Sequence, residues 1–262
     1  MADPTTSALR SVRATRYVTP LREGGSMPGL VEADDDGLYV VKFRGAGQGL
    51  KAPIAEVVVG EVARALGLRV PEVVLVEVDP LLAAAEPDPE IQELVAASGG
   101  SNAALDFLPG ALPFSPAAPV GVTEELAASV VWLDALTANV DRTPRNPNML
   151  IWHGELWLID HGAALYRHHA ASWPQGAATA GFPLIAEHVL LPFAGSIAEA
   201  DERLAPLLDG PVVERIVAAV PDDWLGDDAA LARESYIAYF AERLAAPRAF
   251  VAEAEEARRA LA

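Results

Sequence analysis

The chain has 262 residues, no cysteine and a formal net charge of −18 at pH 7. Without cysteine it has no disulfides, thiolate metal sites or thiol redox chemistry. The negative charge disfavours nucleic acid and anionic lipid headgroups as partners and favours cationic substrates. Hydrophobic residues make up 52% of the chain, which is enough for a substantial core, but no apolar run is long enough to span a membrane.

Residues 1–20 form a polar lead-in that lacks the continuous apolar segment of a secretory signal, so we expect a cytoplasmic location. Two strands follow, near residues 30–33 and 38–43, joined by a tight turn that ends in glycine. A glycine-rich stretch at 24–29 precedes them, and glycines let backbone N–H groups approach phosphates closely. Lys42, near the end of the second strand, can reach the same phosphates, although a solvated lysine on a strand face is the commoner case.

Apolar residues at helical spacing predict a helix over residues 52–66, which Gly67 ends. This helix carries two acidic residues. Glu56 borders the apolar stripe near the start of the helix and is the candidate partner of Lys42, whereas Glu61 is expected to face solvent. The alternative is that both are surface carboxylates, because acidic side chains are exposed unless they are paired.

The next region alternates apolar runs with segments rich in proline and glycine. A strand is expected near residues 73–78, and a short helix in a surface insertion over 81–102. Residues 103–110 are typical of an edge strand that runs into a hinge, where backbone groups would hydrogen-bond an adenine. Residues 109–119 form a proline-rich linker.

Helices are expected over much of the remaining chain. Thr123 is a capping residue, and an apolar stripe continues a helix from it that delivers the chain to Asp141. Further helices are predicted over about 196–208, 211–219 and 228–245, with a final charged helix to residue 262.

The segment from Asp141 to Gly162 is the most informative part of the chain. Asp141 begins a polar loop broken by prolines, which leads into a hairpin of two short apolar runs that ends at Asp160. Phosphoryl transfer from Mg-ATP needs one carboxylate to orient the acceptor hydroxyl, and an amide oxygen and a second carboxylate to hold Mg²⁺. Gly162 would let the chain turn beside the metal. Taken alone, each half has an equally good structural explanation: Asp141 and Asn146 could cap a turn, and Asp160 could end a strand.

The order of these motifs resembles that of the HipA-like kinases, which belong with the phosphoinositide 3/4-kinase-related branch of the protein-kinase-like fold. The resemblance spans about residues 20–200 and is specific in motif order but modest in identity. It rests on the glycine-rich loop, Val40-Val41-Lys42-Phe43, the helix with Glu56, the connection 65–73, Asp141-Arg142, and Ile159-Asp160-His161-Gly162.

The resemblance implies an α+β, bilobal protein-kinase-like fold. A β-rich, nucleotide-binding N-terminal lobe is expected over residues 21–108. A mainly helical C-terminal lobe over 109–262 would carry the catalytic and metal-binding loops. His161 and Thr143 replace the phenylalanine and histidine usual in the family, but neither change removes a charge that the chemistry requires.

The resemblance also implies a role for each candidate residue. Asp141 would be the catalytic aspartate, Lys42 would bind the α- and β-phosphates, and Glu56 would hold that lysine. Asp160 would be the main ligand of Mg²⁺ or Mn²⁺. The second metal ligand is either Asn146, by the spacing of the family, or Asn148, which directly precedes the apolar strand. Contacts to ATP are expected at Gly24, Gly25, Ser26, Lys42, Asp106, Phe107 and Leu108.

Three functions are consistent with these residues. The first is an ATP- and Mg-dependent kinase that phosphorylates a protein serine or threonine or a small-molecule hydroxyl. The second is a pseudokinase that binds nucleotide or a partner without phosphoryl transfer, and the third is a non-enzymatic acidic interaction module. The presence of Lys42, Asp141 and Asp160 together favours the active kinase. The acceptor is unidentified, and no nucleic-acid or membrane partner is expected.

Overall fold

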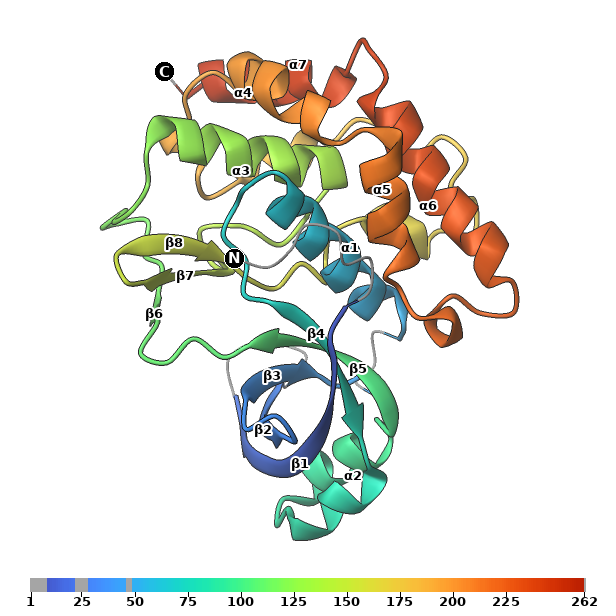
Figure 1. Ribbon diagram of the computed structural model, residues 1–262. Helices are drawn as coiled ribbons and strands as arrows, with labels where there is room; N and C mark the ends of the chain where they lie inside the picture. Colours follow the sequence, from blue (N-terminus) through green and yellow to red (C-terminus); the bar gives the residue numbers. More distant parts are fainter. Residues whose placement is uncertain (1–8, 22–27, 46–48, 262) are drawn as a thin grey trace.

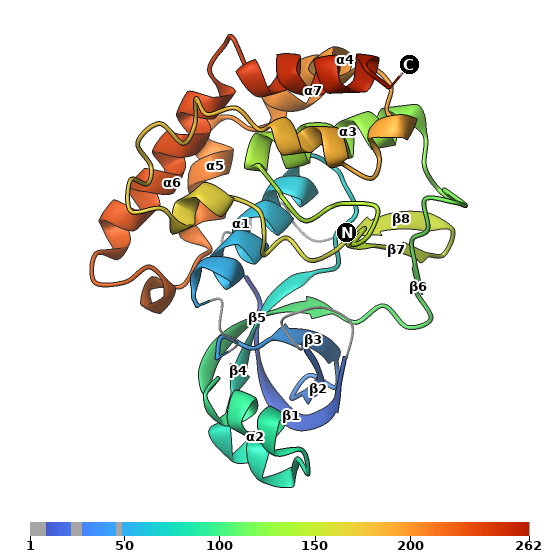
Figure 2. The same ribbon diagram turned by 180° about the vertical axis from the view of Figure 1, so that it is seen from behind.

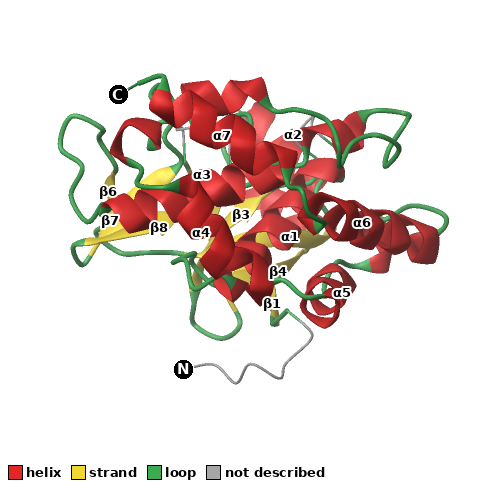
Figure 3. Ribbon diagram, turned by 90° about the horizontal axis from the view of Figure 1, so that it is seen from above, coloured by secondary structure: helices red, strands yellow, loops and turns green. Residues whose placement is uncertain are grey.

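The computed structural model describes residues 9–21, 28–45 and 49–261. Figure 1 shows a small β-barrel in the lower half of the view and most of the helices in the upper half. Figure 2 shows the same arrangement from behind, and Figure 3 shows the helices lying over the strands when the molecule is seen from above. No helix in the described ranges is long and apolar enough to cross a membrane.

The barrel is closed by five strands in the order β1-β2-β3-β5-β4. Neighbouring strands are antiparallel except for β1 and β4, which run parallel. Valines, Tyr39 and Phe43 fill its interior. The strands are β1 (Ser11–Pro20), β2 (Gly29–Ala33), β3 (Leu38–Lys42), β4 (Val73–Val78) and β5 (Gly100–Asp106).

Two expectations about the barrel were wrong. Residues 11–20 were expected in a polar lead-in, but they form β1, whose Val12 and Ala14 are buried while most of its other side chains are exposed. That exposed polar face hid the strand in the sequence. The segment 103–110 was expected to contain an edge strand, but β5 pairs with β3 on one side and β4 on the other. A closed barrel has no free edge for it to occupy.

The insertion between β4 and β5 contains the expected short helix, α2 (Pro89–Ala96), which follows a 3₁₀ turn over Pro80–Ala85. Ile91 and Val95 of α2 are buried against the barrel cluster. Asp88 caps the helix by accepting a hydrogen bond from the N–H of Glu90. The insertion therefore covers the part of the barrel that is remote from most of the helices (Figure 1).

Helix α1 (Lys51–Ala65) contacts both the barrel strands β4 and β5 and the helix α5. Because it has neighbours on several sides, all of its residues from Pro53 to Gly60 are buried. Gly67 ends the helix in the left-handed conformation, as predicted, with φ of 78°. Glu61 differs from the expectation: its side chain is half-buried and pairs with Arg64 at 3.3 Å.

The β-hairpin predicted after Asp141 is present as β7 (Met149–Trp152) and β8 (Glu155–Leu158). The two-residue strand β6 (Leu112–Pro113) joins it to form a small sheet in the order β6-β7-β8. Helix α3 (Glu124–Thr137) precedes the hairpin, and the Thr123 hydroxyl caps it by accepting from the N–H of Leu126 at 3.1 Å. This confirms the predicted start of the helix.

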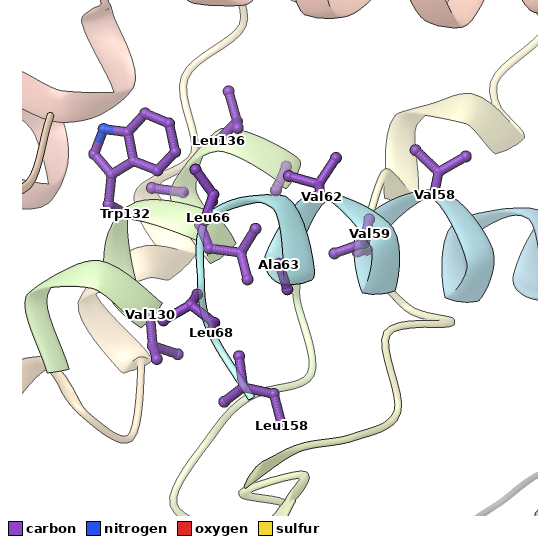
Figure 4. Packing of buried hydrophobic residues seen from close by; sticks show 14 of the residues in the cluster. Val58, Val59, Val62, Ala63, Leu66, Leu68, Val130, Trp132, Leu136 and Leu158 are labelled. Atoms are coloured by element: carbon purple, nitrogen blue, oxygen red, sulfur yellow. The ribbon is translucent and has the colours of Figure 1, made fainter. Parts of the chain in front are cut away.

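The predicted C-terminal helices are also confirmed to within a few residues. They are α4 (Ile197–Leu204), α5 (Gly210–Ala218), α6 (Ala229–Leu244) and α7 (Ala249–Arg259). One hydrophobic cluster joins α1, α3, the hairpin and these helices. Figure 4 shows Val62 of α1 and Leu66, the residue just after its end, beside Trp132 and Leu136 of α3. This shared core fixes the helix that carries Glu56 against the elements that carry Asp141 and Asp160.

Candidate active site

Lys42 at the end of β3 and Glu56 in α1 form an ion pair across the boundary between the barrel and the helices. The distance from Lys42 Nζ to Glu56 Oε2 is 2.6 Å. The Glu56 side chain is 1% exposed and that of Lys42 is 15% exposed. The Lys42 side chain therefore keeps some contact with solvent, whereas the Glu56 side chain that holds it keeps almost none.

Lys42 Nζ also donates to Asp160 Oδ1, so one ammonium group joins two carboxylates. Burial lowers the pKa of Lys42, but the charges of Glu56 and Asp160 outweigh it and raise that pKa above its ordinary value. Burial likewise raises the pKa of Glu56, but the charge of Lys42 and the contact with the His161 side chain hold that pKa well below its usual range. Lys42 and Glu56 are therefore both charged near neutral pH.

Asp160 lies two residues beyond β8 and has a left-handed backbone, with φ of 57°. Its side chain is 35% exposed. The sequence placed the tight turn at Gly162, but it is Asp160 that adopts the unusual conformation, which aspartate tolerates better than most residues. Gly162 has an ordinary φ, and a β-carbon there would meet Ala52 and Glu56 at normal contact distances.

His161, at the position where the resemblance implies a phenylalanine, lies fully buried beside Glu56. Its backbone N–H donates to Glu56 Oε2 at 2.8 Å. Its ring Nδ1 lies 3.5 Å from Glu56 Oε1, and neither atom has a hydrogen-bond partner among the described residues. The residue after Asp160 therefore contacts the same carboxylate as Lys42, which links the two ends of the ion-pair cluster.

Asp141 begins the loop before β7 and accepts two side-chain hydrogen bonds on one oxygen. Asn146 Nδ2 donates to Asp141 Oδ2 at 2.8 Å, and Asn148 Nδ2 donates to the same atom at 3.2 Å. The amide oxygens of both asparagines take no part in these bonds. Asn146 is exposed, whereas Asn148 is half-buried and has a left-handed backbone with φ of 49°.

A backbone hydrogen bond joins the Asp141 loop to the segment that carries Asp160. The N–H of Ile159 donates to the carbonyl oxygen of Asn148 at 3.1 Å. The two ends of the hairpin therefore lie side by side, with Asn148 next to the residue that precedes Asp160. These contacts connect Lys42, Asp160 and Asp141 in one group of residues.

A second, fully buried group of polar side chains supports the Asp141 loop. Asp134 of α3 accepts from Arg142 Nε at 2.6 Å and from Asn139 Nδ2 at 3.0 Å. His188 Nε2 lies 2.8 Å from the same carboxylate. Burial raises the pKa of Asp134, but the Arg142 charge and the His188 hydrogen bond lower it far more. Asp134 and His188 stand outside the motifs from which functional residues were predicted. The only signal for Asp134 was a charge inside the apolar run of α3.

The hinge leaves few backbone donors for a nucleobase. The N–H of Asp106 donates to the Glu72 carbonyl at 2.9 Å, and the N–H of Phe107 donates to that of Leu38 at 2.9 Å. Both groups were expected to contact adenine but are already used inside the barrel. Of the three expected hinge residues, only Leu108 has a backbone N–H that donates to no other group in the described part of the chain.

The expected phosphate-binding loop lies outside the described residues. It contains Gly24, Gly25 and Ser26.

The polar groups at Asp160 suit a magnesium ion that is shared with a nucleotide. Mg²⁺ in ATP-dependent enzymes takes one or two carboxylates together with phosphate oxygens and water, instead of a full protein cage. Asp160 is partly exposed, and the amide oxygen of Asn148 is free of the bonds to Asp141. Within residues 9–21, 28–45 and 49–261, no three His, Asp or Glu side chains cluster as metal ligands. The donors that would hold such an ion are the Asp160 carboxylate and the Asn148 amide oxygen.

Comparison with known proteins identifies the family. The sequence profile of the HipA-like kinases matches residues 15–246. The chain belongs to the HipA-like kinase family. A search of curated proteins gives no match. Among solved structures, the chain is similar to the Helicobacter pylori proinflammatory kinase CtkA, with a TM-score of 0.54 and 13% sequence identity. That match covers 89% of this chain and 94% of CtkA, and at this identity it shows a similar mixed α+β fold.

Proposed function

We propose that this HipA-like protein is an ATP-dependent kinase that uses Mg²⁺ or Mn²⁺ and transfers the γ-phosphate to a hydroxyl group. The observation that carries the proposal is the contact of Lys42 with both Glu56 and Asp160. A kinase needs a fixed lysine for the phosphates and a carboxylate beside it for the metal. Membership of the HipA-like kinase family and the fold shared with a kinase support the same chemistry.

In this proposal the protein is bilobal, with a nucleotide-binding lobe over residues 21–108, extended by β1, and a helical lobe over 109–262. The nucleotide lies between them, with its base near the N–H of Leu108. Lys42 binds the α- and β-phosphates, and Glu56 keeps the lysine in place. A bound Mg²⁺ would neutralise charge on the β- and γ-phosphates. A cytoplasmic location remains part of the proposal.

Asp160 would hold the metal ion together with an asparagine, for which Asn148 is the better candidate. Its half-buried position beside Ile159 places it next to the residue before Asp160, whereas Asn146 is exposed. Asp141 would orient the acceptor hydroxyl. Its Oδ2 is occupied by the two asparagine amides, which leaves Oδ1 to accept the hydroxyl proton.

The acceptor in this proposal is a hydroxyl of a protein serine or threonine or of a small molecule, and the charge of −18 favours a cationic one. The proposal is tested by calorimetric titration with ATP in the presence and absence of Mg²⁺ or Mn²⁺. Metal-dependent binding in the wild type is expected. No binding with either metal would remove both the kinase and the nucleotide-binding pseudokinase.

A further inference from the structure

His188 reaches the Asp141 loop from a distant part of the chain. It follows the 3₁₀ turn Pro183–Glu187 and is only 4% exposed. The N–H of Leu190 donates to His188 Nδ1 at 3.0 Å, so this nitrogen is an acceptor and carries no proton. The proton of the neutral ring therefore resides on Nε2, which donates to Asp134 Oδ2 at 2.8 Å. The two hydrogen bonds fix both the tautomer and the orientation of the ring.

The Asp134 carboxylate that receives this bond holds Asp141 from both sides. On one side Asn139 donates to Asp134 Oδ1, and its own Oδ1 accepts from the backbone N–H of Asp141 at 3.1 Å. On the other side Arg142, the next residue, donates to Asp134 Oδ2.

Arg142 and Asn148 complete a ring of hydrogen bonds. Arg142 Nη1 donates to the Asn148 carbonyl at 2.5 Å, and the Asn148 amide donates to Asp141. The ring therefore runs through Asp134, Arg142, Asn148, Asp141 and Asn139.

We propose that His188 is a positioning residue that fixes Asp141 through Asp134. The proposal rests on the proposed kinase function for its catalytic part. A carboxylate with no exposure keeps one orientation only when its donors surround it, and His188 supplies one of the two donors on Oδ2. The backbone strengthens this link, because the N–H of Val189 donates to the Arg142 carbonyl at 3.1 Å. The segment after the hairpin is thereby tied to the loop that carries Asp141.

The two bonds of His188 can be separated by substitution. His188→Gln places an amide N–H where Nε2 lies, so it can keep the bond to Asp134 while losing the acceptor for Leu190. His188→Asn places an amide oxygen where Nδ1 lies, so it can keep the bond from Leu190 but is too short to reach Asp134. His188→Leu removes both bonds, and His169→Gln at an exposed histidine serves as the control.

The first measurement is phosphoryl transfer at saturating ATP, with ATP affinity and melting temperature measured on the same samples. His188→Asn and His188→Leu are expected to lower kcat about tenfold or more, with the ATP Kd within about twofold of wild type, because a small misplacement of a reacting group is costly. His188→Gln is expected to stay within about threefold of wild type. If Gln performs no better than Asn, or if only the melting temperature changes, the proposal is overturned.

The second measurement does not depend on turnover. Hydrogen exchange should show that the Asp141 amide, bonded to Asn139, loses protection in the Asn and Leu variants but keeps it in the Gln variant and the control. Unchanged protection in all variants overturns the positioning role, whatever the activity. A wild type that binds ATP but transfers nothing contradicts the proposed function, and exchange then decides the positioning of Asp141 separately.

Discussion

Glu56 and Asp134 are both buried carboxylates with a lowered pKa, yet their surroundings differ. The partners of Asp134 are as buried as it is: the Arg142 side chain is 0% exposed and that of His188 is 2% exposed. Glu56 instead pairs with Lys42, which is 15% exposed and also contacts Asp160, which is 35% exposed. The cluster around Glu56 opens toward solvent, whereas the cluster around Asp134 is closed.

The two clusters also differ in net charge. Asp134 and Arg142 cancel, and His188 is neutral in the tautomer that its hydrogen bonds require. Lys42 carries one positive charge against the two negative charges of Glu56 and Asp160, which leaves one negative charge in excess. A closed, balanced cluster serves to hold a loop, while an open cluster with excess negative charge can accept a cation.

The largest effect is expected at the open cluster. Asp160→Ala should lower phosphoryl transfer by about 10³-fold or more and weaken metal-dependent ATP binding, because the main carboxylate of the metal site is lost. Asp227→Ala, at an exposed acid, provides the control. Steady-state kinetics and calorimetry measure both quantities. Full metal-dependent binding by the Asp160 variant would contradict the assignment.

Substitution of Asp134 in the closed cluster should also lower stability, beside any effect on phosphoryl transfer. Asp134→Ala leaves Arg142 as a buried, unpaired charge, which costs about 3–5 kcal/mol in the free energy of unfolding. Urea unfolding measures this loss, and the folded fraction should still bind ATP with near wild-type affinity. A loss below about 1 kcal/mol would show that water or a rearrangement satisfies Arg142, and that the cluster is less closed than the structure indicates.

Substitutions of Asn146 and Asn148 should have smaller effects on turnover than substitution of Asp160. If Asn148 shares the metal with Asp160, Asn148→Ala should reduce metal-dependent turnover about 10- to 100-fold, the range seen for residues that orient or support a metal. The exposed Asn146 also donates to Asp141, so Asn146→Ala should cost clearly less. Turnover measured against metal concentration for both variants decides the order. The reverse order would assign the metal to Asn146.

The smallest effect concerns acid stability. Glu56 has a lowered pKa in the folded state, so its contribution is full above the unfolded value of about 4.3 and is lost as pH falls toward the folded value. Glu56→Gln removes this group, and its unfolding free energy should fall less steeply than that of wild type between about pH 5 and 3. Urea midpoints across this range measure the slopes. Equal slopes would mean that Glu56 does not titrate as a paired group.

The sequence predicted the open cluster better than the closed one for a physical reason. Lys42, Glu56, Asp141 and Asp160 each stand in a motif whose order along the chain resembles that of a known family. Asp134 and His188 stand in no such motif and meet only because α3 packs beside the segment that follows the hairpin. A polar residue inside an apolar helix signals a buried partner, but the sequence alone does not say which residue that partner is.

The wrong predictions about the fold also arose where contacts between distant segments decide the structure. Strand β1 looked like a lead-in because only Val12 and Ala14 of its residues are buried, which is too short an alternation to stand out. Closure of the barrel depends on the pairing of β1 with β4, a contact between distant segments that local patterns do not encode. The helices 52–66, 211–219 and 228–245 were predicted well because their spacing and end signals are local.

In the proposed mechanism the open cluster binds Mg-ATP and Asp141 directs transfer to the acceptor. The most direct test of this mechanism is incubation of wild type and Asp141→Ala with radiolabelled ATP, alone and with cell extract, beside a measurement of ATP affinity. We expect Asp141→Ala to bind ATP nearly as well as wild type yet to yield no labelled protein or small molecule, whereas the wild type yields labelled product. If both proteins bind ATP and both are equally silent in autophosphorylation, labelled product and slow ATP hydrolysis, the kinase account is wrong and the protein is a nucleotide-binding pseudokinase.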